Sequence, residues 1–294
     1  MRRPNELVQS AMRLASLPSI YLRLTEVTTD GRSTSTDVAR VIQEDPSLSA
    51  RLLRLVNSAF YGFPSRVDTI TQAINLVGTN QVMELALASS VLRAFEGIPR
   101  DRVDMDGFWR HSIGTAIAAR AIALRRRVPS AERYFVAGLL HDVGRLVLFL
   151  EEPEAMAMAF TVAESTETLL VEAERATFGF DHADVGRALL ASWKLPMSLQ
   201  EAVGRHHAPP RMGEHAEDAA TIHLADMLSN ALELGFSGER LVPPLDPHAW
   251  ELLGIHTGDI PLIAVDVERQ HADVVQIMLV YDHWAGDPVA LTTH

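Results

Sequence analysis

Apolar residues recur with the period of a helix along almost the whole chain, and this pattern limits the fold more than any other feature. Runs with the strict apolar–polar alternation of a strand are hard to find. Helix start signals agree, since Thr36 can cap a helix that runs through Asp45. Pro46 suits the first turn of the next helix, and Thr79 can cap a third. The sequence therefore predicts an all-α protein built as a multi-helix bundle.

The predicted helices form two halves, separated at residues 96–107, where Gly, Pro and charged residues interrupt the pattern. Helices are predicted at about 46–60, 69–77 and 80–95, and then at 107–127, 131–150, 153–165, 168–177, 182–194, 197–207 and 217–234. Residues 260–279 contain at least one more amphipathic helix. We therefore predict an N-terminal helical half over 1–100, a second helical half over 101–235 and a C-terminal helical extension over 236–294.

The charge and the absence of cysteine exclude several classes of function. The 38 acidic and 26 basic residues give a formal charge of −12, which disfavours non-specific binding to nucleic acid or to an anionic membrane. With no Cys, disulfides, thiolate metal sites and a cysteine nucleophile are excluded. The basic N-terminus is followed by no apolar signal segment, and the apolar stretch 135–150 is too short to span a bilayer. We expect a soluble, cytoplasmic protein.

The histidines are distributed unevenly, and none of the 12 precedes residue 110. A single histidine on a helix is most often a satisfied core or surface residue. In "AGLLHDVGRL", however, His141 and Asp142 are adjacent, so on one helix they point about 100° apart and can share a metal only in a groove between helix faces. Imidazole with carboxylate suits iron, manganese, zinc or nickel. Further ligands would come from other helices, and the candidates are His111, His182, His206, His207 and Asp226.

Several segments resemble known families. "GLLHDVGRL" resembles the core signature of the HD-domain superfamily of metal-dependent phosphohydrolases. The stretch from Asp45 to Gly78 is similar to the N-terminal half of the HDOD family, and "HADVGRALLASWKLP" and "AVGRHH" fit that family too. The resemblance covers roughly residues 12–230. It implies an all-helical module of bacterial signalling whose second half is an HD-like bundle, related to the HD-GYP enzymes that hydrolyse cyclic di-GMP.

The resemblance also implies a complete ligand set for two divalent metals, with Fe or Mn expected first and Zn or Ni as alternatives. The implied ligands are His111, His141, Asp142, His182, His206, His207 and Asp226. Asp142 would bridge two metals about 4 Å apart, and these would acidify a water for attack on phosphorus. Arg145 or Arg205 would hold the phosphate.

Three departures separate the chain from the HD-GYP enzymes. Arg145 stands where they have lysine, and it can still bind phosphate. Ala208 and Gly107 stand at two positions where they have glutamate, which argues against a third metal. The "GYP" element is missing, so the resemblance does not extend to specificity for cyclic di-GMP.

Three functions are compatible with these residues. The first is a regulatory HDOD protein that binds a signalling protein partner and holds a metal in its second half. The second is a metal-dependent phosphohydrolase or phosphodiesterase acting on a nucleotide or a cyclic dinucleotide. The third is a structural remnant without metal. The sequence leaves open whether the site is catalytic.

Other residues fit structural roles. Core packing is predicted for Trp193, Met156, Met158, Leu52, Leu53 and Leu55. His223 could be a spare ligand, but a solvated histidine is the preferred interpretation. "NSAFYGFP", residues 57–64, is interpreted as a turn that fixes the N-terminal half against the second half, with a partner-binding surface as the alternative.

Overall fold

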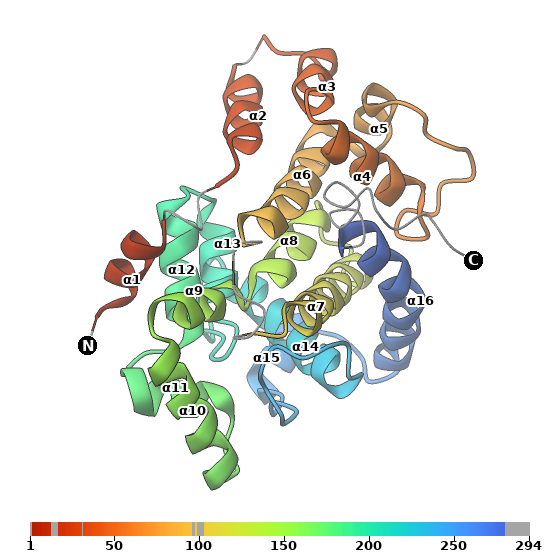
Figure 1. Ribbon diagram of the computed structural model, residues 1–294. Coiled ribbons are helices and arrows are strands. Elements are labelled where there is room, and N and C mark those ends of the chain that lie inside the picture. Colours follow the sequence, from red (N-terminus) through yellow and green to blue (C-terminus); the bar gives the residue numbers. More distant parts are fainter. Residues whose placement is uncertain (1, 13–16, 31, 96–97, 99–102, 280–294) are drawn as a thin grey trace, which may run out of the picture. The chain divides into compact units, whose positions relative to one another are not determined.

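The structure, a computed structural model, describes residues 2–12, 17–30, 32–95, 98 and 103–279, and their regular secondary structure is helical. No strand occurs among these residues, so the all-α prediction is confirmed (Figure 1). The helices are α1 (Pro4–Ala11), α2 (Ser19–Thr29), α3 (Ser35–Gln43), α4 (Pro46–Asn57), α5 (Ile70–Val77), α6 (Thr79–Ala94), α7 (Met105–Arg125), α8 (Glu132–Leu140), α9 (Val143–Glu151), α10 (Pro153–Thr166), α11 (Leu170–Phe178), α12 (His182–Ser192), α13 (Met197–Gly204), α14 (Ala216–Ala231), α15 (Pro247–Leu253) and α16 (Asp259–Leu279).

Helix starts differ from the predicted ones by a residue or two. Thr34, not Thr36, caps α3, because its side chain accepts a hydrogen bond from the backbone N–H of Asp37. Pro46 does open α4, behind an Asp45 side chain that accepts from the Leu48 N–H. Thr79 is the first residue of α6 and not its cap. The predicted helix 131–150 is two helices, and the break between α8 and α9 falls at the His-Asp doublet.

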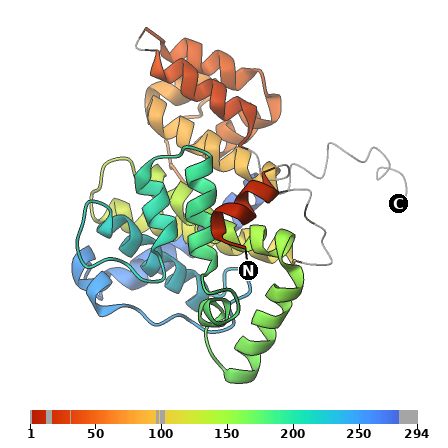
Figure 2. The same cartoon turned by 90° about the vertical axis from the view of Figure 1, so that its left-hand side faces the viewer.

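The chain divides into two compact units. The first comprises Met1–Leu17 and Val91–Val267, and the second comprises Pro18–Ser90 and Glu268–His294. Half of the predicted seam at 96–107 lies outside the described residues. The predicted domain ranges stay a prediction. The structure places α1 against α9 and α12 of the first unit (Figure 2), where Arg2 pairs with Glu151 and Glu152.

The centre of the first unit is α7, which is buried along nearly its whole length between α8 and α14. Small residues allow the close approach of these helices: a Cβ atom on Gly138 would lie 2.6 Å from the Cα atom of Ala116, inside van der Waals contact. On the other side, α9 crosses α12 equally closely. A Cβ on Gly144 would lie 2.4 Å from the backbone nitrogen of Gly186. Glycine at these crossings allows α8 to approach α7 closely, and α9 to approach α12.

The second unit has its own small core of Val56, Val67 and Ala73. The Asn57 side chain closes the loop between α4 and α5, because it donates to the Val67 carbonyl and accepts from the Val67 N–H, both at 2.8 Å. Residues 57–64 therefore form a loop held within this unit, and their predicted role toward the other half stays a prediction.

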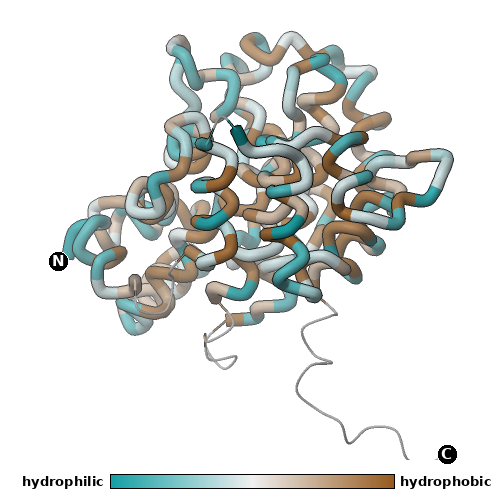
Figure 3. The backbone as a smooth tube through the Cα atoms, turned by 90° about the horizontal axis from the view of Figure 1, so that it is seen from above, coloured by the Kyte–Doolittle hydropathy of each residue, from teal (hydrophilic) through white to brown (hydrophobic). Residues whose placement is uncertain are grey.

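The predicted core residues are confirmed with one exception. Leu52, Leu55, Trp193 and Met156 are buried, and Leu53 is partly buried. Met158, by contrast, is 60% exposed, because α10 buries only Met156 and Ala159. Hydrophilic and hydrophobic residues are interspersed along the helices (Figure 3). Within the described part of the chain no helix has the length and apolar character needed to cross a membrane.

Candidate metal centre

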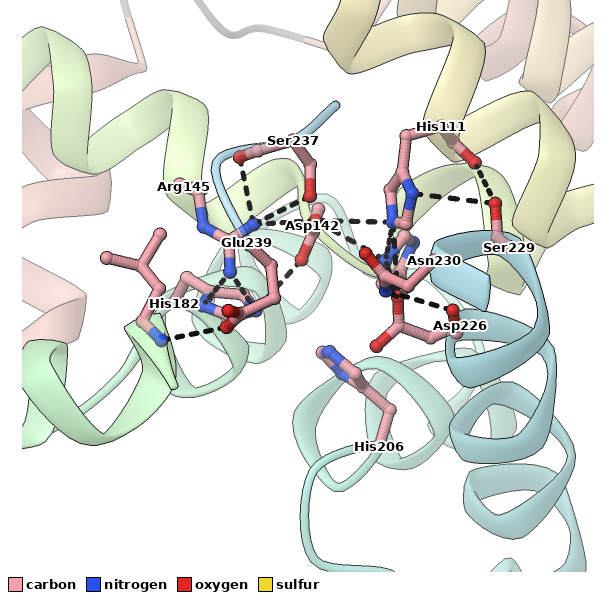
Figure 4. Close-up of polar contacts among 12 residues, drawn as sticks. His111, Asp142, Arg145, His182, His206, Asp226, Ser229, Asn230, Ser237 and Glu239 are labelled. Atoms are coloured by element: carbon pink, nitrogen blue, oxygen red, sulfur yellow. Dashed lines mark hydrogen bonds and ion pairs between the residues drawn. The ribbon is translucent and has the colours of Figure 1, made fainter. Parts of the chain in front are cut away.

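All seven predicted ligands come together in the first unit, from five places in the chain. Figure 4 labels His111, Asp142, His182, His206 and Asp226 among them. They are His111 on α7, His141 and Asp142 between α8 and α9, His182 at the start of α12, His206 and His207 after α13, and Asp226 on α14. Six of the seven are at most 5% exposed, and His207 is half-buried.

The break between α8 and α9 allows the side chains of the adjacent residues His141 and Asp142 to point into the same space. His141 ends α8 with helical backbone angles, whereas Asp142 has φ −97° and ψ 1°, outside the helix. Both side chains therefore reach the same space, and His141 Nε2 lies 3.4 Å from Asp142 Oδ2. The 100° separation expected on one continuous helix does not apply.

The ligand atoms form two groups. The first ligand group consists of Asp142, His182, His206 and His207, and the second consists of His111, His141 and Asp226. Within each group the ligand atoms all lie within 4.8 Å of one another. Each group offers the nitrogen and oxygen atoms that borderline and hard divalent metals prefer.

Asp142 lies between the two groups. Its Oδ1 is 2.9 Å from His182 Nε2 in the first group. Its Oδ2 is 3.4 Å from His141 Nε2 and 3.9 Å from His111 Nε2 in the second. One carboxylate thus presents a different oxygen to each group, which is the arrangement a bridging ligand requires.

The histidine rings are oriented by hydrogen bonds at Nδ1. His141 Nδ1 donates to the Gly138 carbonyl at 2.7 Å, and His206 Nδ1 donates to the Val203 carbonyl at 2.6 Å. His182 Nδ1 lies 2.6 Å from the Glu174 carboxylate, to which it donates, and 2.9 Å from Arg145 Nη2. In His141 and His206 the partner is a carbonyl, which only accepts, so Nδ1 carries the proton and Nε2 is the nitrogen left to face the site, as in metal-binding histidines.

The second ligand group has similar supports on α14. Asn230 Nδ2 donates to Asp226 Oδ1 at 2.8 Å, and that oxygen lies 3.1 Å from His111 Nε2. The Ser229 hydroxyl donates to the His111 carbonyl at 3.2 Å and lies 3.5 Å from His111 Nδ1. These contacts hold α14 and α7 in one register at the site.

The buried charges perturb the site strongly. Burial lowers the pKa of His141, but the carboxylates of Asp142 and Asp226 outweigh it and raise that pKa to about 10. For His206, burial and the neighbouring His141 and His182 lower the pKa to about 3. Burial opposes ionisation of Asp142, yet the cations around it, Arg145 first, hold its pKa well below the usual range. The second aspartate, Asp226, also has a lowered pKa.

The residues fit a divalent cation. His206 is fully buried, and its Nε2 has no hydrogen-bond partner among the described residues, a costly state for a polar atom unless a ligand binds it. Ring nitrogens and two carboxylates converge on the same space, which is a donor set for Fe, Mn, Zn or Ni and not for a thiolate-bound zinc.

The sequence profile of the HDOD domain matches residues 14–209, two thirds of the chain. The chain belongs to the HDOD domain family. An HDOD domain protein of unknown function from Geobacter sulfurreducens has a similar crystal structure, with a TM-score of 0.72 and 24% identity over 94% of this chain and 98% of that one. This likeness supports the fold.

Two further similarities bear on the HDOD assignment. A protein from Shewanella amazonensis, described as a candidate phosphohydrolase, matches with a TM-score of 0.69 and 26% identity over 92% of this chain and 96% of that one. An uncharacterized protein from Treponema pallidum is 25% identical over 226 residues, which are 75% of this chain. The chain spans only 43% of the length of that relative.

In this HDOD protein the two arginines predicted to bind phosphate lie in different environments. Arg145 is 2% exposed and donates to Asp142 Oδ2 at 2.8 Å, to Glu174 Oε1 at 3.1 Å and to Ser237. The side chain of Arg205 is 48% exposed and pairs with Glu201. The donors of Arg145 therefore face protein acceptors, and phosphate binding by either residue stays a prediction.

Some residues around the site were not anticipated or were interpreted wrongly. His223 is neither solvated nor a ligand: it is buried, its Nδ1 donates to the His206 carbonyl, and its Nε2 accepts from the Asp246 N–H. The sequence predicts no role for Glu174 at the site. Its position does carry a signal, because Glu174 lies four residues from both Leu170 and Phe178, on the apolar face of α11.

Proposed function

We propose that this chain is a regulatory HDOD protein of bacterial signal transduction, with a dinuclear His/Asp metal site that joins helices of its HD half. The observation that carries the proposal is Asp142, whose two oxygens face separate ligand groups on α7, α12 and α14. A signalling protein would be the partner, as the family resemblance implies.

Burial of the ligands favours a closed, structural or regulatory metal centre. Catalytic metal sites keep a coordination position open to substrate, whereas structural sites surround the metal with protein ligands. Here six of the seven ligands are at most 5% exposed. Arg145, which could have bound a substrate phosphate, instead pairs with the bridging carboxylate. A metal at this site would act as a clamp whose loading changes the stability of the bundle.

A second candidate function is that of a metal-dependent phosphohydrolase or phosphodiesterase acting on a nucleotide or cyclic dinucleotide. The completeness of the ligand set favours it, together with the 26% identity to the Shewanella protein. A divalent metal would supply a Lewis acid there. His207 is half-buried and Arg205 is exposed. A substrate phosphate would enter the site on the side of these two residues.

Turnover and thermal unfolding distinguish the two candidates. For the closed regulatory site we expect no hydrolysis of a generic phosphodiester with Mn or Fe, and a lower Tm after metal removal. Metal at 100 times its Kd would contribute about 2.7 kcal/mol to the free energy of unfolding. Metal-dependent hydrolysis that is abolished by Asp142→Ala would instead establish the phosphohydrolase.

A further inference from the structure

Glu174 is a fully buried carboxylate that does not belong to either ligand group, yet it touches both the metal ligand His182 and Arg145. Its Oε2 accepts hydrogen bonds from His182 Nδ1 at 2.6 Å and from the His182 backbone N–H at 3.0 Å. Its Oε1 accepts from Arg145 Nε at 3.1 Å. Both oxygens are therefore committed to side chains that border the metal site.

The position of His182 explains why it needs a carboxylate from another helix. His141 and His206 each donate from Nδ1 to the carbonyl three residues earlier, a partner that the preceding helical turn supplies. His182 is the first residue of α12, so no helical turn precedes it. A side chain from α11 takes the place of that carbonyl, and unlike a carbonyl it carries a full negative charge.

We propose that Glu174 is the positioning residue that makes His182 a metal ligand, acting on the first ligand group alone. The inference rests on the proposed metal site. The hydrogen bond to Nδ1 fixes the ring orientation and directs Nε2 to the metal, and a carboxylate partner raises the basicity of that nitrogen. Glu174 thus sets the metal affinity of the first ligand group without contacting the metal.

Arg145 makes this arrangement possible. A buried carboxylate without a counter-charge is strongly destabilising, and the Arg145 guanidinium lies against Glu174 Oε1. The same guanidinium donates to Asp142 Oδ2 at 2.8 Å. One arginine therefore balances the positioning carboxylate and the bridging carboxylate together.

The histidines and the aspartate of the second ligand group take their hydrogen-bonded supports from residues other than Glu174. His111 and His141 are oriented by Ser229 and by the Gly138 carbonyl, and Asp226 is held by Asn230. Replacing Glu174 should consequently weaken one of two metals. Loss of such a partner typically costs about 10- to 100-fold in metal affinity.

Titration of the metal-free full chain with Co(II) tests the proposal, with calorimetry for affinity and visible absorption for ligand geometry. Glu174→Gln keeps the size and an acceptor but removes the charge. Glu172→Gln, an exposed site on the same helix, is the matched control. We expect two binding events in wild type and control. In Glu174→Gln one event should be unchanged and the other about 10- to 100-fold weaker, with an altered spectrum.

The outcomes separate this inference from the proposed function. The positioning role would be overturned if Glu174→Gln bound both Co(II) ions with wild-type affinity and spectrum. It would also be overturned if the affinity for both ions fell equally. A wild-type chain that binds no Co(II) would overturn the metal site itself. If Glu174→Gln does not fold, Glu174→Asp keeps the charge beside Arg145 and withdraws the carboxylate from His182. The same selective weakening is then expected, and unchanged binding would refute the inference.

Discussion

Asp142 Oδ1 lies 2.9 Å from Nε2 of His182, and this contact joins the junction of α8 and α9 to the first residue of α12. Because the other oxygen of Asp142 faces His141, the carboxylate connects the two ligand groups. A dinuclear metal site in this HDOD domain would depend on this one side chain more than on any other.

Replacing the bridge should affect both metals. Asp142→Asn keeps the shape of the side chain but removes the charge shared by the two groups, so both metals should be lost or strongly weakened. Metal content after dialysis, measured by mass spectrometry, provides the test. Asp106→Asn, whose side chain is 66% exposed on α7, is the control and should keep wild-type content. Retention of one tightly bound metal in Asp142→Asn would show that Asp142 serves a single group.

Removing a ligand that belongs to one group should affect one metal. His111→Ala deletes a nitrogen of the second ligand group, and His207→Ala deletes one of the first. Each variant should keep a single metal of wild-type affinity, which calorimetric titration of the metal-free proteins measures. Two equally weakened metals in both variants would contradict the division into groups.

The crossing of α9 and α12 should not tolerate a methyl group. In Gly144→Ala the new Cβ would lie 2.0 Å from the His182 carbonyl oxygen, so the helices must separate. Overpacking of this kind costs about 1–3 kcal/mol. Urea unfolding measures the loss, and Gly258→Ala is the control, since its Cβ would meet nothing within 4 Å. Equal stability of the two variants would show that the crossing is less tight than described.

The buried charge of Arg145 should contribute more to folding stability than to phosphate binding. Arg145→Met leaves Glu174 without its counter-charge and should lower the free energy of unfolding by about 3–5 kcal/mol. Arg205→Met removes a half-exposed pair and should cost about 1 kcal/mol or less. Denaturant unfolding of both metal-free variants compares them. A nearly neutral Arg145→Met would favour the phosphate-binding role that the sequence predicted.

The fold and the ligand residues could be predicted because they leave local or recognisable signals. Helical periodicity predicts α4 through α14 closely, and the His-Asp signature indicates where ligands come from. The sequence does not predict the break at Asp142, because residues 135–150 contain no Pro and their two glycines, Gly138 and Gly144, lie within α8 and α9 and not at the break. The sequence analysis also assigns no helix at α1, α2 or α15.

The supporting residues were harder to predict because their roles depend on tertiary distance. In the sequence Glu174 is one of several charged residues of α11, and only the structure shows that His182 lies beside it. His223 was interpreted as solvated because its partners, the His206 carbonyl and the Asp246 N–H, come from separate segments. Met158 is predicted in the core because the sequence does not show how much of α10 is covered by other helices. In the structure α10 buries only Met156 and Ala159.

Metal content of the untagged full chain is the direct test of the proposed two-metal site. The protein would be purified without a histidine tag, incubated with Mn, Fe or Zn, freed of excess metal and measured by elemental analysis. We expect about two bound metals per chain with at least one of these ions. Less than about half a metal per chain with all three would contradict it, because a site complete in ligands and oriented at Nε2 should bind at least one of them.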